Sequence, residues 1–304
     1  MAFNPQVFRT RALTALVFVA VMLSGLLWSG WSFFLLFTII HFGCWFEYRR
    51  LMTRIFHGYG GIPEVHFYAV TLTGWCLMIL AGGEMLKIGE RSLTDLPIRE
   101  IFFIMLLLSL ATVMLAGQGR SRNLAISLFG LAYISASWAL LIHLRSGQLW
   151  MSGGSGEDAY RHFMDSLGSL VGYVIPLVTI ATIWINDTMA YLVGSFIGKR
   201  PLSPISPKKT WEGTIGGFIL AILASTGLYY ISEEISLTSL LVLTGLVILF
   251  GTLGDLVESL FKRSLNLKDS GSILPGHGGI LDRFDTILIS APFVFLHFVF
   301  LITL

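Results

Sequence analysis

The 304-residue sequence is 55% hydrophobic and only 12% charged, with a formal net charge of +2. A soluble domain carries about a quarter charged residues, and a single core could not hide this much apolar surface from water. The composition therefore excludes a soluble globule, and basic residues scattered among loops argue against a nucleic-acid-binding face. We expect an all-α, polytopic membrane protein in contact with the lipid bilayer.

Apolar stretches suited to transmembrane helices recur along the whole chain, since about 20 apolar residues cross a bilayer as a helix. Lipid offers no partner to free backbone groups, so each stretch is expected to be helical. The first stretch follows Arg9 and Arg11, is too long for a signal peptide and lacks a clear cleavage site, so we interpret it as a retained span. About nine spans are predicted, covering residues 13–27, 31–46, 67–81, 101–116, 124–144, 167–185, 216–231, 237–251 and 286–304.

The distribution of Lys and Arg predicts the orientation of these spans. If the helices alternate, the basic residues before the first span and after the second, fourth, sixth and eighth fall on one side. We expect that side, and the N-terminus, to be cytoplasmic, with the C-terminus outside. The opposite turn at Glu233 and Glu234 is acidic, whereas the loop from Met85 to Arg99 carries both signs and is a partial exception. We therefore expect a multi-pass protein of a cell membrane, with its basic loops in the cytoplasm.

The two halves of the chain differ in polarity. Residues 1–144 are expected to form N-terminal transmembrane helices with few polar side chains at mid-depth, and residues 145–166 a polar extracytoplasmic loop. Polar residues crowd the spans of residues 167–304, which we expect to be the catalytic transmembrane domain. Cys44 and Cys76 have no CxxC spacing and no neighbouring His or Cys set, so core packing is their default interpretation.

A first polar cluster, Asn186–Asp187–Thr188, directly follows an apolar run. An Asp joined to a membrane span is costly unless it is paired, hydrated or metal-bound. Asn and Asp also cap helices well at an interface. A cap and a role in binding substrate or metal therefore both stay open.

A second cluster, with the sequence SPISPKKTWEG, covers residues 203–213. Helix N-termini attract anions through free amides, and the neighbouring Lys208 and Lys209 add positive charge. Alternatively, the lysines only set the membrane orientation and Trp211 lies at the level of the lipid headgroups. That alternative explains the basic and aromatic residues but not the repeated Ser-Pro. Phosphate binding and a purely topological role stay open for this segment.

The third cluster extends from Asp255 to Asp285. Asp255 and Glu258 are one helical turn apart, and Asp282 and Asp285 repeat that spacing at the last span. Carboxylates hold Mg²⁺ through oxygen, and the Lys and Arg residues between them suit phosphates that Mg²⁺ bridges. The glycines at 276, 278 and 279 allow close approach of backbone amides to an anion. A solvated loop would not need four acids at this spacing, so the segment indicates a phosphate-handling site rather than a simple loop.

The same residues resemble a known signature, that of the phosphatidate cytidylyltransferases or CDP-diacylglycerol synthases. The pattern from Ser259 to Asp285 is SxxKRxxxxKDxxxxxPxHGGxxDRxD. Two upstream blocks are also similar to the family, DTxAYxxG from Asp187 and SPKKTxEG from Ser206. The resemblance covers the C-terminal 120 residues, and it implies a membrane-embedded helical fold, often dimeric, that converts CTP and phosphatidate to CDP-diacylglycerol and pyrophosphate with a divalent metal, usually Mg²⁺. It also implies that the metal-binding acids are Asp255 and Asp282.

Roles for the remaining candidates combine this resemblance with their chemistry. Further or outer metal ligands are expected at Asp187, Glu258 and Asp285, with room for a second cation beside Mg²⁺. Cations that neutralise the triphosphate and the lipid phosphate are expected at Lys208, Lys209, Lys262, Arg263, Lys268 and Arg283. Donors to phosphate or cytidine are expected at Ser206, Thr210, Ser259, Gly278 and Gly279. His277 is open between a general acid, a phosphate donor and a loop histidine.

Two alternative functions remain at this point. A CTP-dependent lipid-alcohol kinase would share the nucleotide and lipid contacts but transfer the γ-phosphoryl group. A secondary transporter would place charges in broken helices, but it predicts matching interruptions in two halves, and only one half here is polar. No GxxxxGK[ST] loop, HExxH motif or zinc-type Cys/His set occurs in the sequence.

Overall fold

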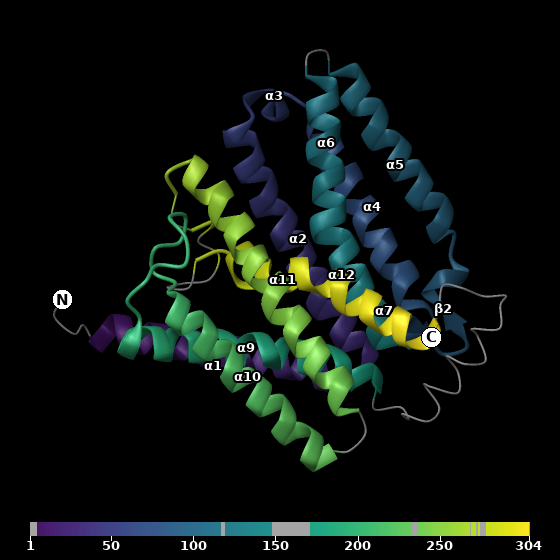
Figure 1. Cartoon of the computed structure of the whole chain (residues 1–304). Coiled ribbons are helices and arrows are strands. Elements are labelled where there is room, and N and C mark those ends of the chain that lie inside the picture. Colours follow the sequence, from purple (N-terminus) through teal and green to yellow (C-terminus); the bar gives the residue numbers. More distant parts are fainter. Residues whose placement is uncertain are drawn as a thin grey trace. The chain divides into compact units, whose positions relative to one another are not determined.

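The computed structural model describes residues 5–116, 119–147, 171–232, 236–267, 269–271, 273 and 278–303. These residues are almost entirely helical (Figure 1). Besides three short helical turns, η1 (Gly83–Leu86), η2 (Leu93–Asp95) and the π-helical η3 (Leu131–Ala136), the helices are α1 (Pro5–Leu27), α2 (Gly30–Ile55), α3 (His57–Gly60), α4 (Glu64–Gly82), α5 (Ile98–Leu115), α6 (Arg120–Gly130), α7 (Ser137–Ser146), α9 (Val171–Ile197), α10 (Trp211–Ser232), α11 (Leu237–Ser264) and α12 (Leu281–Thr303). Strands β1 (Lys87–Ile88) and β2 (Arg91–Ser92) form a small antiparallel hairpin in which Lys87 is opposite Ser92.

The prediction of an all-α, multi-pass membrane protein is confirmed. Where its residues are described, each predicted span overlaps a helix or, for residues 124–144, the consecutive helical elements α6, η3 and α7. Seven helical segments in the described part of the chain are long and apolar enough to cross a membrane. α12 is not among them, and Leu13–Leu27 of α1 forms a shorter apolar stretch. The count of nine is therefore not confirmed.

Several helices extend well beyond the apolar runs that predicted them. α9 continues to Ile197, and α11 continues through a charged segment to Ser264. In α11 the added segment contains Glu, Lys and Arg, which are good helix formers, whereas α9 continues past the polar Asn186 and Asp187 into a further apolar stretch. Asn186 and Asp187 therefore lie inside α9, and the interpretation of this cluster as a helix cap is wrong.

The chain forms two compact units. Unit 1 contains Met1–Ser146 and Phe261–Phe284, and unit 2 contains Gly147–Leu260 and Asp285–Leu304. Both α11 and α12 cross from one unit into the other along the chain. The predicted domain boundaries at residues 144 and 166 stay a prediction, and the predicted loop from residue 148 onward lies outside the described residues.

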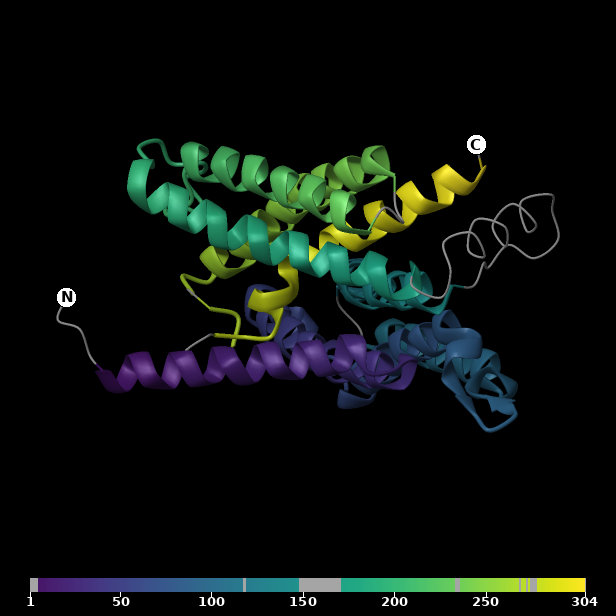
Figure 2. The ribbon, with the colours of Figure 1, turned by 90° about the horizontal axis from the view of Figure 1, so that it is seen from below.

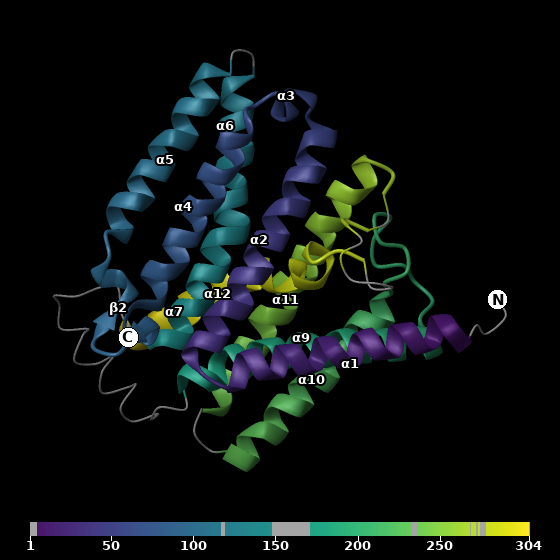
Figure 3. The same ribbon diagram turned by 180° about the vertical axis from the view of Figure 1, so that it is seen from behind.

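In unit 1, α2 supplies much of the core, and α4 packs against α5 and α7 (Figure 3). Ser29 and Ser32 form a reciprocal capping box at the start of α2, which satisfies its free backbone amides. The core is aromatic, with Phe37 and Trp45 fully buried. Ser135, in the π-helical turn, accepts a hydrogen bond from Trp45 Nε1 at 2.9 Å.

The expectation of few polar side chains at mid-depth of the N-terminal spans stays a prediction, because burial among packed helices does not give depth in a bilayer. Unit 1 buries a set of polar and charged side chains from several helices, namely His41, Glu47, His66, Thr71, Thr73, Ser109, Asn123, Ser127, Ser135, Ser137, His143 and Arg145. His66, for example, lies 2.8 Å from Ser127 Oγ and within hydrogen-bonding distance of Ser109 O. Each helix holds only one or a few of these residues, so they come together only when the helices pack.

In unit 2, α9 and α10 run side by side (Figure 2). Small residues allow the two backbones to approach, as in many membrane helix pairs. A Cβ atom on Gly213 would lie 2.6 Å from the backbone oxygen of Ala190, and one on Gly217 would lie 2.7 Å from that of Asn186. Part of the family-like DTxAYxxG and TxEG blocks therefore serves helix packing.

Candidate active site

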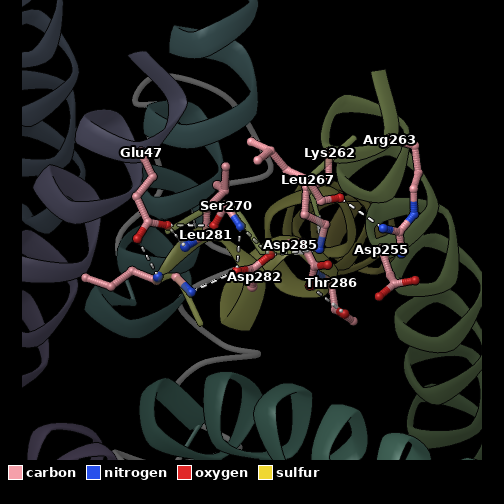
Figure 4. Close-up of polar contacts among 12 residues, drawn as sticks. Glu47, Asp255, Lys262, Arg263, Leu267, Ser270, Leu281, Asp282, Asp285 and Thr286 are labelled. Carbon is pink, nitrogen blue, oxygen red and sulfur yellow. Dashed lines mark hydrogen bonds and ion pairs between the residues drawn. The ribbon is translucent and has the colours of Figure 1, made fainter. Parts of the chain in front are cut away.

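A buried ion pair within the signature segment joins the end of α11 to the start of α12 in unit 1. Lys262 Nζ donates to Asp282 Oδ1 at 2.7 Å, and the two side chains are only 11% and 6% exposed. Asp282 also accepts from Gly279 N at 2.8 Å and from Ser270 N at 2.9 Å (Figure 4). Asp282 occupies the first turn of α12, where free amides and the helix dipole favour a negative charge. The signature thus forms a compact anionic centre stabilised by one lysine and by backbone donors.

A second buried carboxylate holds the same segment from the N-terminal half of the chain. Glu47 on α2 is 1% exposed and accepts from Ser270 Oγ at 2.8 Å, Ile280 N at 3.0 Å and Leu281 N at 2.9 Å (Figure 4). Sequence reasoning missed Glu47 because it follows the predicted second span and stands beside basic residues. A carboxylate at the end of a membrane span is costly when it has no partner, and that was the available signal.

The end of α11 is shaped by a left-handed residue. Asn266 has φ +53°, and the amides of Asn266 and Leu267 donate back to the carbonyls of Arg263 and Lys262. This Schellman arrangement closes the helix where Asn replaces the usual glycine. The guanidinium of Arg263 also donates to Leu267 O at 2.9 Å, so this exposed cation holds the turn in place.

Unit 2 contains another lysine–acid centre. Lys209 Nζ lies 3.0 Å from Asp255 Oδ2 on α11. Burial lowers the pKa of the Lys209 ammonium, but the negative charges of Asp255, Asp187 and Asp285 outweigh burial, so its pKa lies above the ordinary 10.5. Lys209 is therefore a permanent cation surrounded by three carboxylates that the sequence analysis had selected.

The segment that presents Lys209 is a short hairpin-like loop between α9 and α10. Leu202 N donates to Lys209 O at 2.7 Å, and Pro201 pairs with Thr210 as an antiparallel bridge. Thr210 Oγ1 accepts from Gly213 N at 3.1 Å at the start of α10, and the carboxylate of Glu212 accepts from the amide of Lys199 at 3.1 Å. Thr210 thus has a capping contact in addition to the donor role predicted for it.

The remaining candidates are distributed as follows. Glu258 and Ser259 are buried on α11, and Asp285 is buried on α12, where it accepts from Thr286 N at 2.6 Å. Gly254 packs against the backbone of Asp285, so α11 and α12 are in close contact within unit 2. Ser206 is partly exposed in the loop, the side chains of Lys208, Asp187 and Arg283 are exposed, and Gly278 has φ +85° next to Asp282. Lys268 and His277 lie outside the described residues.

The expected Mg²⁺ ligands offer carboxylate oxygens, which this hard cation prefers. Within the described ranges, no three His, Cys, Asp or Glu side chains form a group that could hold a metal ion. Asp255 and Asp282 are instead each paired with a lysine. The carboxylate oxygens suit Mg²⁺. To bind this cation, Asp255 and Asp282 would have to be shared with, or released by, Lys209 and Lys262.

The apolar helices and the lysine–carboxylate pairs near their ends together define the class of protein. It is a multi-pass membrane protein with charged groups suited to binding phosphate esters. A sequence model described as the cytidylyltransferase family matches residues 9–301. The chain belongs to this family.

Bacterial relatives named phosphatidate cytidylyltransferase are similar over much of the chain. The protein of Staphylococcus haemolyticus is 35% identical over 228 residues, which cover 73% of this chain and 86% of the relative. That of Staphylococcus saprophyticus is 30% identical over 286 residues, covering 93% and 96%. That of Bacillus subtilis is 45% identical over 138 residues, covering 44% and 51%. The family resemblance noted from the signature is thereby confirmed.

Proposed function

We propose that this protein transfers the cytidylyl group of CTP to phosphatidate, giving CDP-diacylglycerol and pyrophosphate. The observation that carries this proposal is the family match from residue 9 to residue 301, together with relatives named for the reaction. The two lysine–carboxylate centres supply the charges that such chemistry needs. The whole chain, rather than the signature alone, therefore corresponds to the enzyme.

A phosphate oxygen of phosphatidate attacks the α-phosphorus of CTP, and the bond from that phosphorus to the β-phosphate oxygen breaks to release pyrophosphate. The attacking oxygen is ionised at neutral pH, so no strong base is needed. The protein has to neutralise charge and hold the reactants in line. We assign neutralisation to Lys209 and Lys262 together with Lys208, Arg263, Lys268 and Arg283.

Asp255 and Asp282 would hold Mg²⁺ in this proposal, with Asp187, Glu258 and Asp285 as further or outer ligands. When bound, the cation neutralises and orients phosphate oxygens. Support comes from the carboxylate donors themselves and from the resemblance in sequence. The lysines that now pair with Asp255 and Asp282 are well placed to exchange a carboxylate for a substrate phosphate.

Ser206, Thr210, Ser259 and the amides of Gly278 and Gly279 are proposed donors to the substrates. The site is proposed to face the cytoplasm of a bacterial inner membrane, because Lys and Arg concentrate on that side of the predicted spans. A homodimer is proposed from the family resemblance alone.

The test uses purified protein in detergent with phosphatidate and CTP carrying label in either the α- or the γ-phosphate. We expect the α-label to appear in the lipid and the γ-label in pyrophosphate, and removal of Mg²⁺ with a chelator to stop both. Release of CDP with γ-label in the lipid would instead identify a lipid kinase. Absence of any labelled lipid with folded protein, Mg²⁺ and both substrates would refute the proposal.

A further inference from the structure

Glu47 is the charged group that joins the N-terminal half of the chain to the signature segment. It belongs to α2, yet its hydrogen-bond donor Ser270 is 223 positions away in the sequence. All three donors, Ser270 Oγ, Ile280 N and Leu281 N, lie in or beside the signature. A buried carboxylate is costly unless its oxygens are satisfied, and these donors satisfy it.

The surroundings of Glu47 are specific for a carboxylate. Its two oxygens face only donors among these contacts, so the amide group of a glutamine would turn a donor toward another donor. Gly271 and Gly279 also pack directly against the carboxylate, and a Cβ atom at either position would collide with it. The segment is therefore shaped around this side chain.

The contacts of Glu47 lead directly to Asp282. Ser270 donates its hydroxyl to Glu47 and its backbone amide to Asp282. At the start of α12, Gly279 N donates to Asp282, whereas the next two amides, of Ile280 and Leu281, donate to Glu47. Consecutive amides at the start of α12 thus bind two different carboxylates, and Ser270 binds both. The position of Asp282 therefore depends on that of Glu47.

We infer that Glu47 is a positioning residue for cytidylyl transfer. It fixes the segment around Ser270 and the start of α12, so that Asp282 and its partner Lys262 are held where the reaction needs them. The inference rests on the proposed function, because Asp282 and Lys262 are assigned there to metal and phosphate. In this inference Glu47 acts through the backbone around Asp282 rather than by contact with the reactants.

The test compares Glu47→Gln with the wild-type protein and with Glu64→Gln as a matched control. Glu64 lies in the same unit and also pairs with a basic residue, Arg49, but its side chain is exposed and its partner lies outside the signature. The first measurement is hydrogen–deuterium exchange of peptides covering residues 278–285. We expect faster exchange in Glu47→Gln only, because two amides lose their acceptor geometry.

The second measurement is kcat per folded, monodisperse protein, taken well below the unfolding temperature. A displacement of about 1 Å in a reacting group costs on the order of 10²-fold in rate, so we expect a fall in kcat of about that size with KM values within roughly threefold of wild type. A purely structural residue would lower the unfolding temperature but leave kcat of the folded fraction unchanged.

Ser270→Ala provides the second variant, for the case in which Glu47→Gln does not fold. It removes the hydroxyl that reaches Glu47 but keeps the amide that reaches Asp282. We expect a smaller loss, again in kcat rather than in KM. Unchanged exchange in Glu47→Gln, faster exchange with unchanged kcat, or an equal loss in Glu64→Gln would each overturn the inference. An inactive wild-type protein would refute the proposed function instead, and the exchange comparison would still test the contacts of Glu47.

Discussion

Replacing Lys262 with methionine should destabilise the protein by removing one member of a buried ion pair. The ammonium and the Asp282 carboxylate are 2.7 Å apart, and both side chains are almost fully covered. Methionine keeps most of the length and apolar volume of lysine, so the change isolates the charge. Asp282 would then stay buried and lose this ammonium partner.

The expected cost is smaller than for a typical broken pair. Leaving a buried charge without its partner costs about 3–5 kcal/mol. Asp282 keeps the amides of Ser270 and Gly279, and the dipole of α12 stabilises it by about 0.3–1 kcal/mol. We therefore expect Lys262→Met to lower the free energy of unfolding by about 2–3 kcal/mol.

The assay is denaturant unfolding in detergent micelles, followed by tryptophan fluorescence, for Lys262→Met, Asp282→Asn and the double variant. Removing both charges leaves no buried ion unpaired, so the double variant should be more stable than the sum of the single losses predicts, by about 1–2 kcal/mol. Arg263→Met is the matched control, because this neighbouring cation is exposed and its hydrogen bond to Leu267 O is worth about 1 kcal/mol or less. If Lys262→Met costs the same with and without Asp282, the ion pair contributes nothing and the reasoning is wrong.

Other consequences concern turnover, charge and packing. Asp282→Asn should abolish labelled-lipid formation while the protein still inserts into membranes, and near-normal turnover with Mg²⁺ would contradict its metal role. Lys209→Ala should mainly raise KM for CTP or phosphatidate, which steady-state kinetics with each substrate will show; unchanged values for both would exclude the role. The pKa of Lys209 is raised in the folded protein, so its stabilising charge pair with Asp255 is fully present below pH 10.5 and is lost only as the pH rises through the higher folded pKa. The difference in unfolding free energy between wild type and Lys209→Met should therefore stay constant from pH 7 to about 9. Gly213→Ala should push α10 away from Ala190 and lower the unfolding temperature, whereas an unchanged midpoint would show that the two helices adjust freely.

The positions of the helices were largely predictable, because each apolar run has to become helical in lipid. Their ends were not, since α9 and α11 continue through polar residues that hydropathy counts against a span. Asp187 shows the consequence, because the break in apolarity at this residue looked like a helix end and proved to be the interior of α9. Hydropathy identifies apolar segments of the chain, whereas the backbone hydrogen bonds determine the residue at which a helix ends.

The candidate acids were predicted from local spacing, but their partners were not. The one-turn spacing of Asp255 and Glu258 marked a helix face, yet it could not indicate that Asp255 pairs with Lys209, a residue of the loop between α9 and α10. The role of Glu47 could not be predicted, because no local sequence pattern links α2 to a segment more than 200 positions later. A single carboxylate after an apolar span has many harmless explanations when the sequence is considered alone.

The contacts of Glu47 also explain why the N-terminal half cannot be regarded as a passive set of spans. A signature segment rich in glycine has little side-chain packing to order it, and its backbone amides need fixed acceptors. The acceptor comes from α2, whose position is set by the aromatic and polar core of unit 1. The residues proposed for the chemistry all lie in the C-terminal half, whereas the acceptor that fixes the backbone around Asp282 belongs to α2.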